Sequence, residues 1–321
     1  MRIFRHFDDL PSECRGAAVA IGNFDGVHLG HQALIARTND LARENSAPAG
    51  VLAFEPHPQE YFRPEAEPFR LTPFRTKARL LAECGVDAMY AIAFDATMAQ
   101  RTAEEFVRDV LVKGLGANVV VVGSEFRFGK GRAGDASVLM ELARRYGFAV
   151  EIFAPVLAHD AQKISSTEIR DALTAGKPDV AARLLGHWWA IEGHVEHGDA
   201  RGRLLGFPTA NMPLDGYMRP KFGIYAVRAT VTENEKPVAS HIGVANVGIR
   251  PMFETPHALI EAYLFDFDGD LYGKHLSVEL MAYLRPEMKF ESTDALKAQM
   301  SKDCAEARRI LPALADRRLR N

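Results

Sequence analysis

Short apolar runs alternate with longer amphipathic stretches through the first half of the chain. The runs are rich in aliphatic residues and short enough to be buried strands; they cover residues 17–21, 50–54, 88–94, 118–122 and 149–153. The stretches between them space their apolar residues as helices do, near residues 30–45, 74–84, 102–115 and 135–147. This alternation predicts repeated βαβ units, hence an α/β Rossmann-like domain with a parallel sheet. Such sheets bind ligands beyond the carboxyl ends of their strands.

The pattern changes from about Trp188 onward. Short alternating runs separated by Gly, Pro and Asp cover residues 223–230, 241–247, 259–267 and 276–284. They predict antiparallel strands and a small β-barrel. After Ser292, apolar residues at helical spacing with charges between them predict a packed C-terminal helix. Residues 164–187 read as short helices, so we expect one domain over residues 1–186 and a second over 187–321.

Composition narrows the classes of partner. A length of 321 residues fits about two domains at ~150 residues each. With 39 basic and 42 acidic residues the formal charge is -3, which argues against a nucleic-acid-binding protein. Three widely spaced cysteines form no pair typical of disulfides or zinc, and the charged N-terminus does not resemble a signal peptide. No apolar run approaches the ~18 residues of a membrane helix. These features predict a cytoplasmic protein without membrane association.

The first candidate site follows the first apolar run. Its sequence is Gly22-Asn-Phe-Asp-Gly-Val-His28-Leu-Gly30-His31, and a helix is expected directly afterwards. Glycines let the backbone approach a ligand closely, and the first turn of a helix attracts anions. Two imidazoles three residues apart can point into one pocket and donate hydrogen bonds to a phosphate whose charge grows in a transition state. The segment has neither the Gly-Lys-Ser/Thr of a Walker loop nor the GxGxxG dinucleotide fingerprint.

A second polar segment precedes the short helices. It reads Lys163-Ile-Ser-Ser-Thr-Glu-Ile-Arg170, and Ser165 with Glu168 fits a capping box. A capped helix start with hydroxyl groups and Arg170 is also suited to hold phosphates.

The third candidate site lies in the second half. A loop rich in glycine and arginine precedes Gly206-Phe-Pro-Thr-Ala-Asn211, in which Thr209 and Asn211 share one face of an extended segment. A hydroxyl and an amide oxygen suit Mg²⁺ that keeps phosphate and water ligands. Glu261 lies within an apolar strand, where a carboxylate is costly unless it is paired or solvated.

Together these motifs resemble the family of bacterial bifunctional riboflavin kinase/FMN adenylyltransferases, over roughly residues 18–308. The HxGH and ISSTxIR motifs resemble its nucleotidylyltransferase domain, and the Gly-Phe-Pro-Thr-Ala-Asn segment resembles its riboflavin kinase domain. The resemblance implies phosphorylation of riboflavin by ATP to FMN, followed by adenylylation of FMN to FAD with release of pyrophosphate. The implied partners are small molecules, and the protein is expected to be a monomer or a weak homo-oligomer.

The resemblance also implies roles for particular residues. The implied catalytic residues are His28, His31, Arg170 and Glu261, the last accepting the proton of the riboflavin 5′-hydroxyl. Nucleotide binding is implied for Gly22, Asp25, Gly30, His57, Ser165, Ser166, Thr167, Gly202 and Arg203. Flavin binding is implied for Glu125, Phe126, Phe128 and Arg285, although core packing is an equal alternative for each phenylalanine. Thr209 and Asn211 are implied to bind Mg²⁺ with ATP.

Two positions depart from the family pattern. Glu125 stands where the family usually has Asn or Asp, and Met252 stands where Thr is common. The first departure suggests one alternative, a riboflavin kinase whose adenylyltransferase domain is impaired. A nucleotidylyltransferase with another phosphorylated acceptor and a flavin-binding regulatory protein are further alternatives. The intact kinase signature argues against the former, and ATP turnover would exclude the latter.

Overall fold

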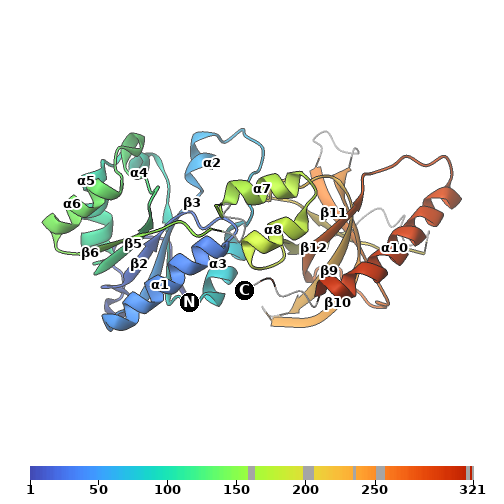
Figure 1. The fold of residues 1–321 in the computed structure, drawn as a ribbon, viewed down its shortest axis with the longest axis horizontal. Coiled ribbons are helices and arrows are strands. Elements are labelled where there is room, and N and C mark those ends of the chain that lie inside the picture. The colour runs from blue at the N-terminus through green and yellow to red at the C-terminus, as the bar shows by residue number, and fades with distance from the viewer. Residues whose placement is uncertain (158–162, 198–205, 234–235, 251–256, 316–318, 320–321) are drawn as a thin grey trace. The chain divides into compact units, whose positions relative to one another are not determined.

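The computed structural model describes residues 1–157, 163–197, 206–233, 236–250, 257–315 and 319, and the chain forms two compact units (Figure 1). The first unit comprises Met1–Glu67 and Thr72–Ser165, and the second comprises Pro68–Leu71 and Ser166–Asn321. The helices that precede the barrel therefore group with it. The domain limit expected at residue 186 stays a prediction.

The first unit contains a six-stranded parallel sheet with the order β1-β4-β3-β2-β5-β6. Its strands are β1 (Arg2–Phe4), β2 (Ala18–Ile21), β3 (Ala49–Glu55), β4 (Ala88–Ala93), β5 (Val119–Gly123) and β6 (Ala149–Phe153). The five apolar runs form β2 to β6, as predicted. Only β1 was not expected, because a short exposed edge strand has no apolar pattern.

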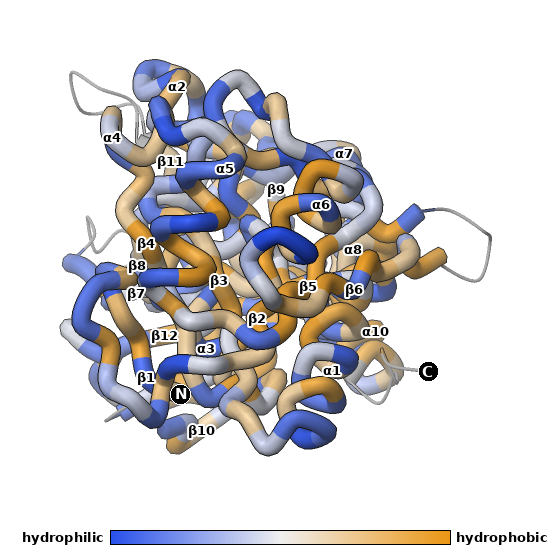
Figure 2. Tube along the Cα trace, turned by 90° about the vertical axis from the view of Figure 1, so that its left-hand side faces the viewer, coloured by the Kyte–Doolittle hydropathy of each residue, from blue (hydrophilic) through white to orange (hydrophobic). Residues whose placement is uncertain are grey.

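Helices cover both faces of this sheet. They are α1 (Leu29–Glu44), α2 (Pro58–Phe62), α3 (Phe74–Glu83), α4 (Ala96–Gln100), α5 (Ala103–Glu105), the π-helical segment η2 (Phe106–Gly114) and α6 (Ala136–Tyr146). Ala18 and Ala20 of β2 pack with α1 and α3, whereas Val19 and Ile21 pack with η2 and α6. The central strand β2 is therefore buried on both sides, and its neighbour β5 is hydrophobic along its length (Figure 2).

The strand order reverses beside β2. The chain proceeds from β2 to β3 and β4 on one side, and β5 and β6 lie on the other. Loops that leave the carboxyl ends of β2 and β5 therefore flank the switch point of the sheet. Ligands bind at this place in open α/β sheets.

The second unit contains a six-stranded antiparallel sheet with the order β7-β12-β9-β10-β11-β8. The strands are β7 (Ala190–His194), β8 (Ala210–Pro213), β9 (Gly223–Glu233), β10 (Lys236–Arg250), β11 (His257–Leu264) and β12 (His275–Arg285). An antiparallel bridge between Glu196 and Asn211 joins the two outer strands and nearly closes the sheet into the predicted barrel.

In the part of the second unit that the structure describes, the barrel is accompanied by α7 (Ser166–Thr174), α8 (Pro178–Leu185) and α10 (Thr293–Ala315). Ala307 and Leu311 of α10 are fully buried against Ala226, Val244 and Met281 of the sheet. The C-terminal helix predicted after Ser292 is therefore confirmed. Among the described residues, no helix is long and apolar enough to cross a membrane.

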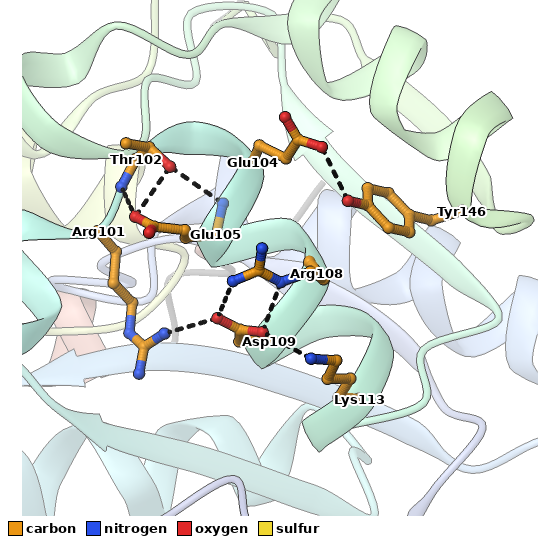
Figure 3. Close-up of polar contacts among 8 residues, drawn as sticks. All are labelled: Arg101, Thr102, Glu104, Glu105, Arg108, Asp109, Lys113 and Tyr146. Carbon is orange, nitrogen blue, oxygen red and sulfur yellow. Dashed lines mark hydrogen bonds and ion pairs between the residues drawn. The ribbon is translucent and has the colours of Figure 1, made fainter.

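The π-helical segment carries a cluster of ionic contacts (Figure 3). The carboxylate of Asp109 lies 3.1 Å from Arg101, 2.8 Å from Arg108 and 3.3 Å from Lys113. Hydrogen bonds from the Arg108 guanidinium, then contact with Lys113, hold the pKa of this carboxyl well below its usual range.

Candidate active sites

The loop between β2 and α1 has an unusual backbone. Phe24, Gly26 and Val27 all have positive φ angles, of 49°, 84° and 42°. A branched residue such as valine rarely adopts this conformation, so the fold must hold it there. Phe24 and Val27 are buried, at 0% and 1% exposure. The strain is therefore concentrated in the segment that contains the first predicted site.

His28 ends this loop and caps α1. Its Nδ1 accepts a hydrogen bond from the backbone N–H of His31 at 3.2 Å. A neutral imidazole that accepts through Nδ1 carries its proton on Nε2. Gly30 allows this arrangement, because a Cβ at position 30 would lie 3.2 Å from the His28 ring. The cap therefore makes the opposite edge of the His28 ring a hydrogen-bond donor.

The two histidine rings are stacked. Their centroids lie 3.6 Å apart and their planes differ by 15°. Burial first, then the neighbouring His28 and Lys77, hold the pKa of His31 well below its usual value. His31 is therefore neutral near pH 7. Its Nδ1 is buried and has no hydrogen-bond partner among the described residues.

Lys77 was not assigned a role from the sequence. It lies in α3 and is only 1% exposed, although a lysine in an amphipathic helix usually points to solvent. Its charge acts on His31, so a buried cation lies close to the paired imidazoles.

Asp25 and His57 also lie at the carboxyl ends of strands. Asp25 is 2% exposed, and its Oδ1 accepts the backbone N–H of Thr72 at 3.0 Å. Thr72 Oγ1 in turn accepts the N–H of Gly26 at 2.9 Å, so Thr72 fixes the strained loop. His57 follows β3 and caps α2 through Nδ1, 3.1 Å from the backbone nitrogen of Gln59.

The loop after β5 contains the residues predicted to bind flavin in this unit. Glu125 is exposed, and one of its oxygens lies 2.5 Å from Lys163 Nζ. The rings of Phe126 and Phe128 stack with centroids 5.4 Å apart. Phe128 is 7% exposed and belongs to the core, whereas Phe126 is partly buried beside it. The structure thus brings these residues to the switch point, and flavin contact stays a prediction.

The ISSTxIR motif is divided between the units. Ile164 and Ser165 belong to the first, and the carbonyl oxygen of Ile164 lies 3.8 Å from where a Cβ on Gly30 would be. Ser166, Thr167 and Arg170 begin α7 in the second. Arg170 Nε donates to the carbonyl of Phe69 at 2.7 Å. Phosphate binding by this motif stays a prediction.

In the second unit, three polar residues lie side by side across neighbouring strands. Glu261 of β11 pairs directly with Asn211 of β8 on one side and with Asn246 of β10 on the other. Residues directly opposite in antiparallel strands share a face, with Cβ atoms about 4.5–5.5 Å apart. Asn246 was not assigned a role from the sequence, because its significance depends on this register.

Thr209 is hydrogen-bonded to Asn211, one of these three residues. Asn211 Nδ2 donates to the Thr209 carbonyl at 3.2 Å, which turns the amide oxygen of Asn211 away from that carbonyl. The half-buried hydroxyl and the amide oxygen are the neutral ligands that suit Mg²⁺ with phosphate and water. Gly202 and Arg203 lie outside the described residues.

Arg285 makes a different contact from the one that its predicted role suggests. Its Nη2 lies 2.7 Å from Oδ2 of Asp303 in α10, and its Nε lies 3.0 Å from Oδ1. Both side chains are largely buried, at 16% and 8% exposure. The pair joins the end of β12 to α10 directly before the Pro286-Glu287 segment. Flavin contact by Arg285 stays a prediction.

Models of known protein families match both units of the chain. A family model described as FAD synthetase matches residues 10–168, and one described as riboflavin kinase matches residues 185–311. The bifunctional riboflavin kinase/FMN adenylyltransferase of Escherichia coli K12 is 42% identical over 311 residues, covering 96% of this chain and 97% of the relative. The protein of that name from Pseudomonas fluorescens is 41% identical, covering 99% and 100%.

One solved structure has the same architecture across the chain. It is described as a macrolide-efflux protein from Streptococcus pneumoniae and is 31% identical, with a TM-score of 0.82. The match covers 96% of this chain and 98% of that one.

Proposed function

The chain belongs to the family of bifunctional riboflavin kinase/FMN adenylyltransferases, and from this premise we propose which residues carry each of its two reactions. The enzyme phosphorylates riboflavin to FMN with ATP, and it adenylylates FMN to FAD with release of pyrophosphate. Both family models are matched, which favours this function over a kinase with an impaired adenylyltransferase domain.

Glu261 acts as the base of the kinase reaction. Its carboxylate takes the proton of the riboflavin 5′-hydroxyl while that oxygen forms a bond to the γ-phosphorus of ATP. The bond between this phosphorus and the β,γ-bridging oxygen breaks, and ADP leaves. The register that places Glu261 directly opposite Asn211 carries this proposal, because it sets the base beside the residues suited to hold nucleotide.

Thr209 and Asn211 would hold Mg²⁺ together with ATP. When bound, the cation would neutralise charge on the transferred phosphoryl group. The protein's own contribution is to fix the two ligands: Asn211 is anchored in β8, and its Nδ2 contact with the Thr209 carbonyl sets the direction of its oxygen.

His28 and His31 stabilise the adenylyl transfer. An oxygen of the FMN phosphate attacks the α-phosphorus of ATP, and the bond to the β-phosphate breaks to release pyrophosphate. The protein supplies no nucleophile, so catalysis consists of positioning and of stabilising charge. The Nε2–H groups of the stacked imidazoles are the donors, and Lys77 adds buried positive charge nearby. Arg170, Ser165, Ser166 and Thr167 are proposed to hold the triphosphate on the family motif alone.

One incubation tests the order of the reactions. Purified protein receives riboflavin, ATP and Mg²⁺, and the flavins are separated by chromatography at successive times. We expect FMN to appear before FAD, with both requiring ATP. FMN without FAD would contradict the adenylyltransferase assignment, and flavin binding without either product would contradict both. Replacing Mg²⁺ by EDTA should stop FMN formation.

A further inference from the structure

Asn246 lies beside the base of the kinase site. Its position on β10 is directly opposite Glu261 on β11, in the row that continues to Asn211 on β8. The alternate positions of these two strands face the other way and carry small or apolar residues at 1% exposure or less, namely Ala245, Val247, Ile260 and Ala262. Asn246 is thus a polar residue on the face that bears the site, rather than part of the barrel interior.

In the side-chain amide of Asn246, the NH₂ group has a hydrogen-bond partner and the oxygen has none among the described residues. Its Nδ2 donates to Oε1 of Glu287 at 3.2 Å. Its Oδ1 is closed off from solvent and has no hydrogen-bond partner among the residues that the structure describes. A buried acceptor without a donor is unfavourable, so this oxygen would gain from a ligand that brings an N–H or O–H group.

Glu287 orients the amide, and Gly248 leaves room for its carboxylate. A Cβ at position 248 would lie 2.4 Å from Oε1 of Glu287, so only glycine lets that carboxylate approach Asn246 in this way. The negative carboxylate attracts the NH₂ group and repels the amide oxygen. Gly248 and Glu287 therefore act together to present an acceptor, not a donor, on the side of Asn246 that lacks a partner.

We propose that Asn246 is a substrate-positioning residue of the kinase site, whose Oδ1 accepts a hydrogen bond from the polyol hydroxyl next to the one that Glu261 deprotonates. The proposal rests on the proposed role of Glu261. ATP phosphates present acceptors only, so they do not satisfy Oδ1. A polyol chain does, because it carries a second O–H on the neighbouring carbon, and Asn246 is the immediate neighbour of Glu261 across the strands.

The test compares riboflavin with an analogue that lacks only the hydroxyl adjacent to the phosphorylated one. A site built to bond a hydroxyl discriminates strongly against a substrate without it. We expect the unchanged enzyme to prefer riboflavin at least 10-fold in kcat/KM, and Asn246→Leu to phosphorylate both substrates with nearly equal kcat/KM. Equal reduction for both substrates, with the preference retained, would show a structural role and overturn the proposal. Equal kcat/KM of the unchanged enzyme for riboflavin and for the analogue would also overturn the proposal.

Gly248→Ala is the second variant, because it leaves Asn246 and Glu261 in place and displaces only the Glu287 carboxylate. We expect its preference for riboflavin to fall between those of the unchanged enzyme and Asn246→Leu; full retention would contradict the orienting role. FAD formation from supplied FMN reports that the first unit is folded, and an unchanged urea unfolding midpoint reports the same for the second unit, which holds both substitutions. Glu261→Gln separates the proposed role of Glu261 from that of Asn246. If this variant retains kinase activity, the assignment of Glu261 as the base is wrong. The preference for riboflavin over the analogue, which tests Asn246, is still measured directly.

Discussion

Asn211 on β8 and Glu261 on β11 occupy directly opposite positions of two hydrogen-bonded strands, although fifty residues separate them along the chain. The pairing puts the proposed base, Glu261, and the proposed nucleotide-side ligand, Asn211, within one side chain's reach on the same face of the barrel. We therefore expect Glu261→Gln to reduce FMN formation by at least 10²-fold, the lower range for loss of a general base. FAD formation from supplied FMN should remain. Loss of both activities in a folded protein would contradict two separate sites.

His28 serves both as a helix cap and as a proposed phosphate donor, and two substitutions separate these roles. Asparagine is a good N-cap but has no imidazole, whereas alanine has neither property. We expect His28→Asn to keep the free energy of unfolding within a few tenths of a kcal/mol, and His28→Ala to lower it by about 1 kcal/mol. Both should reduce FAD formation by about 10²–10³-fold, as removal of a transition-state donor does. FAD formation by His28→Asn at the rate of the unchanged enzyme would show that capping is the only role.

The buried His31 should make stability depend on pH. Burial, together with His28 and Lys77, lowers the pKa of His31 in the folded protein, whereas in the unfolded chain it stays near 6.5. The unfolded state therefore binds more protons below that pH, so the contribution is present above about pH 6.5 and is lost as the pH falls. We expect the urea concentration at the unfolding midpoint to decrease as the pH is lowered from about 7 to about 5. In His31→Gln this fall should be smaller. Replacement of the exposed His6 by Gln is the control, and an equal effect there would contradict the assignment.

Asp109 should contribute to stability at neutral pH but not in acid. Its pKa is lowered in the folded state by Arg108 and then Lys113, so its stabilisation is present above the unfolded value near 3.9 and is lost as the pH falls below it. Because the ion pairs are partly exposed, Asp109→Asn should cost only about 1 kcal/mol at pH 7. The difference between the variant and the unchanged protein, measured by urea unfolding, should shrink toward pH 2. A constant difference would mean that packing, not charge, is responsible.

The sequence predicted most of the fold because burial leaves a clear pattern. The aliphatic runs became the parallel strands β2 to β6, and the alternating runs became β9 to β12 of the barrel, whereas the short strands β1, β7 and β8 were not predicted. It did not predict the π-helical hydrogen bonds of η2, such as the one from the N–H of Leu115 to the carbonyl of Val110, because local apolar spacing does not distinguish them from an α-helix. Lys77 and Asn246 were missed for a related reason. A buried lysine and a register across three strands are properties of the folded chain, not of a local pattern.

Residues 68–71 belong to the second unit, and one of their hydrogen bonds to the rest of that unit can be removed by a single substitution. The indole N–H of Trp189 donates to the carbonyl of Leu71 at 2.8 Å, and Trp189 is 1% exposed. Trp189→Phe leaves a large aromatic ring but orphans this buried carbonyl, so the free energy of unfolding should fall by about 1–3 kcal/mol. Trp188→Phe, a neighbouring buried tryptophan, is the matched comparison for loss of ring volume. Equal losses would show that the hydrogen bond to Leu71 adds little.

The same segment constrains how this chain can change by recombination. Three consecutive backbone carbonyls of this segment accept hydrogen bonds from the rest of the second unit. The donors are Arg170 to Phe69, Met218 to Arg70 and Trp189 to Leu71. Residues before and after this segment belong to the first unit, so the chain enters the second unit, returns, and enters it again after Ser165. A single crossover between two genes would exchange the later residues and leave this segment from the other parent. A kinase unit transferred from another protein therefore fits only if residues 68–71, which lie within the sequence of the first unit, are compatible with it.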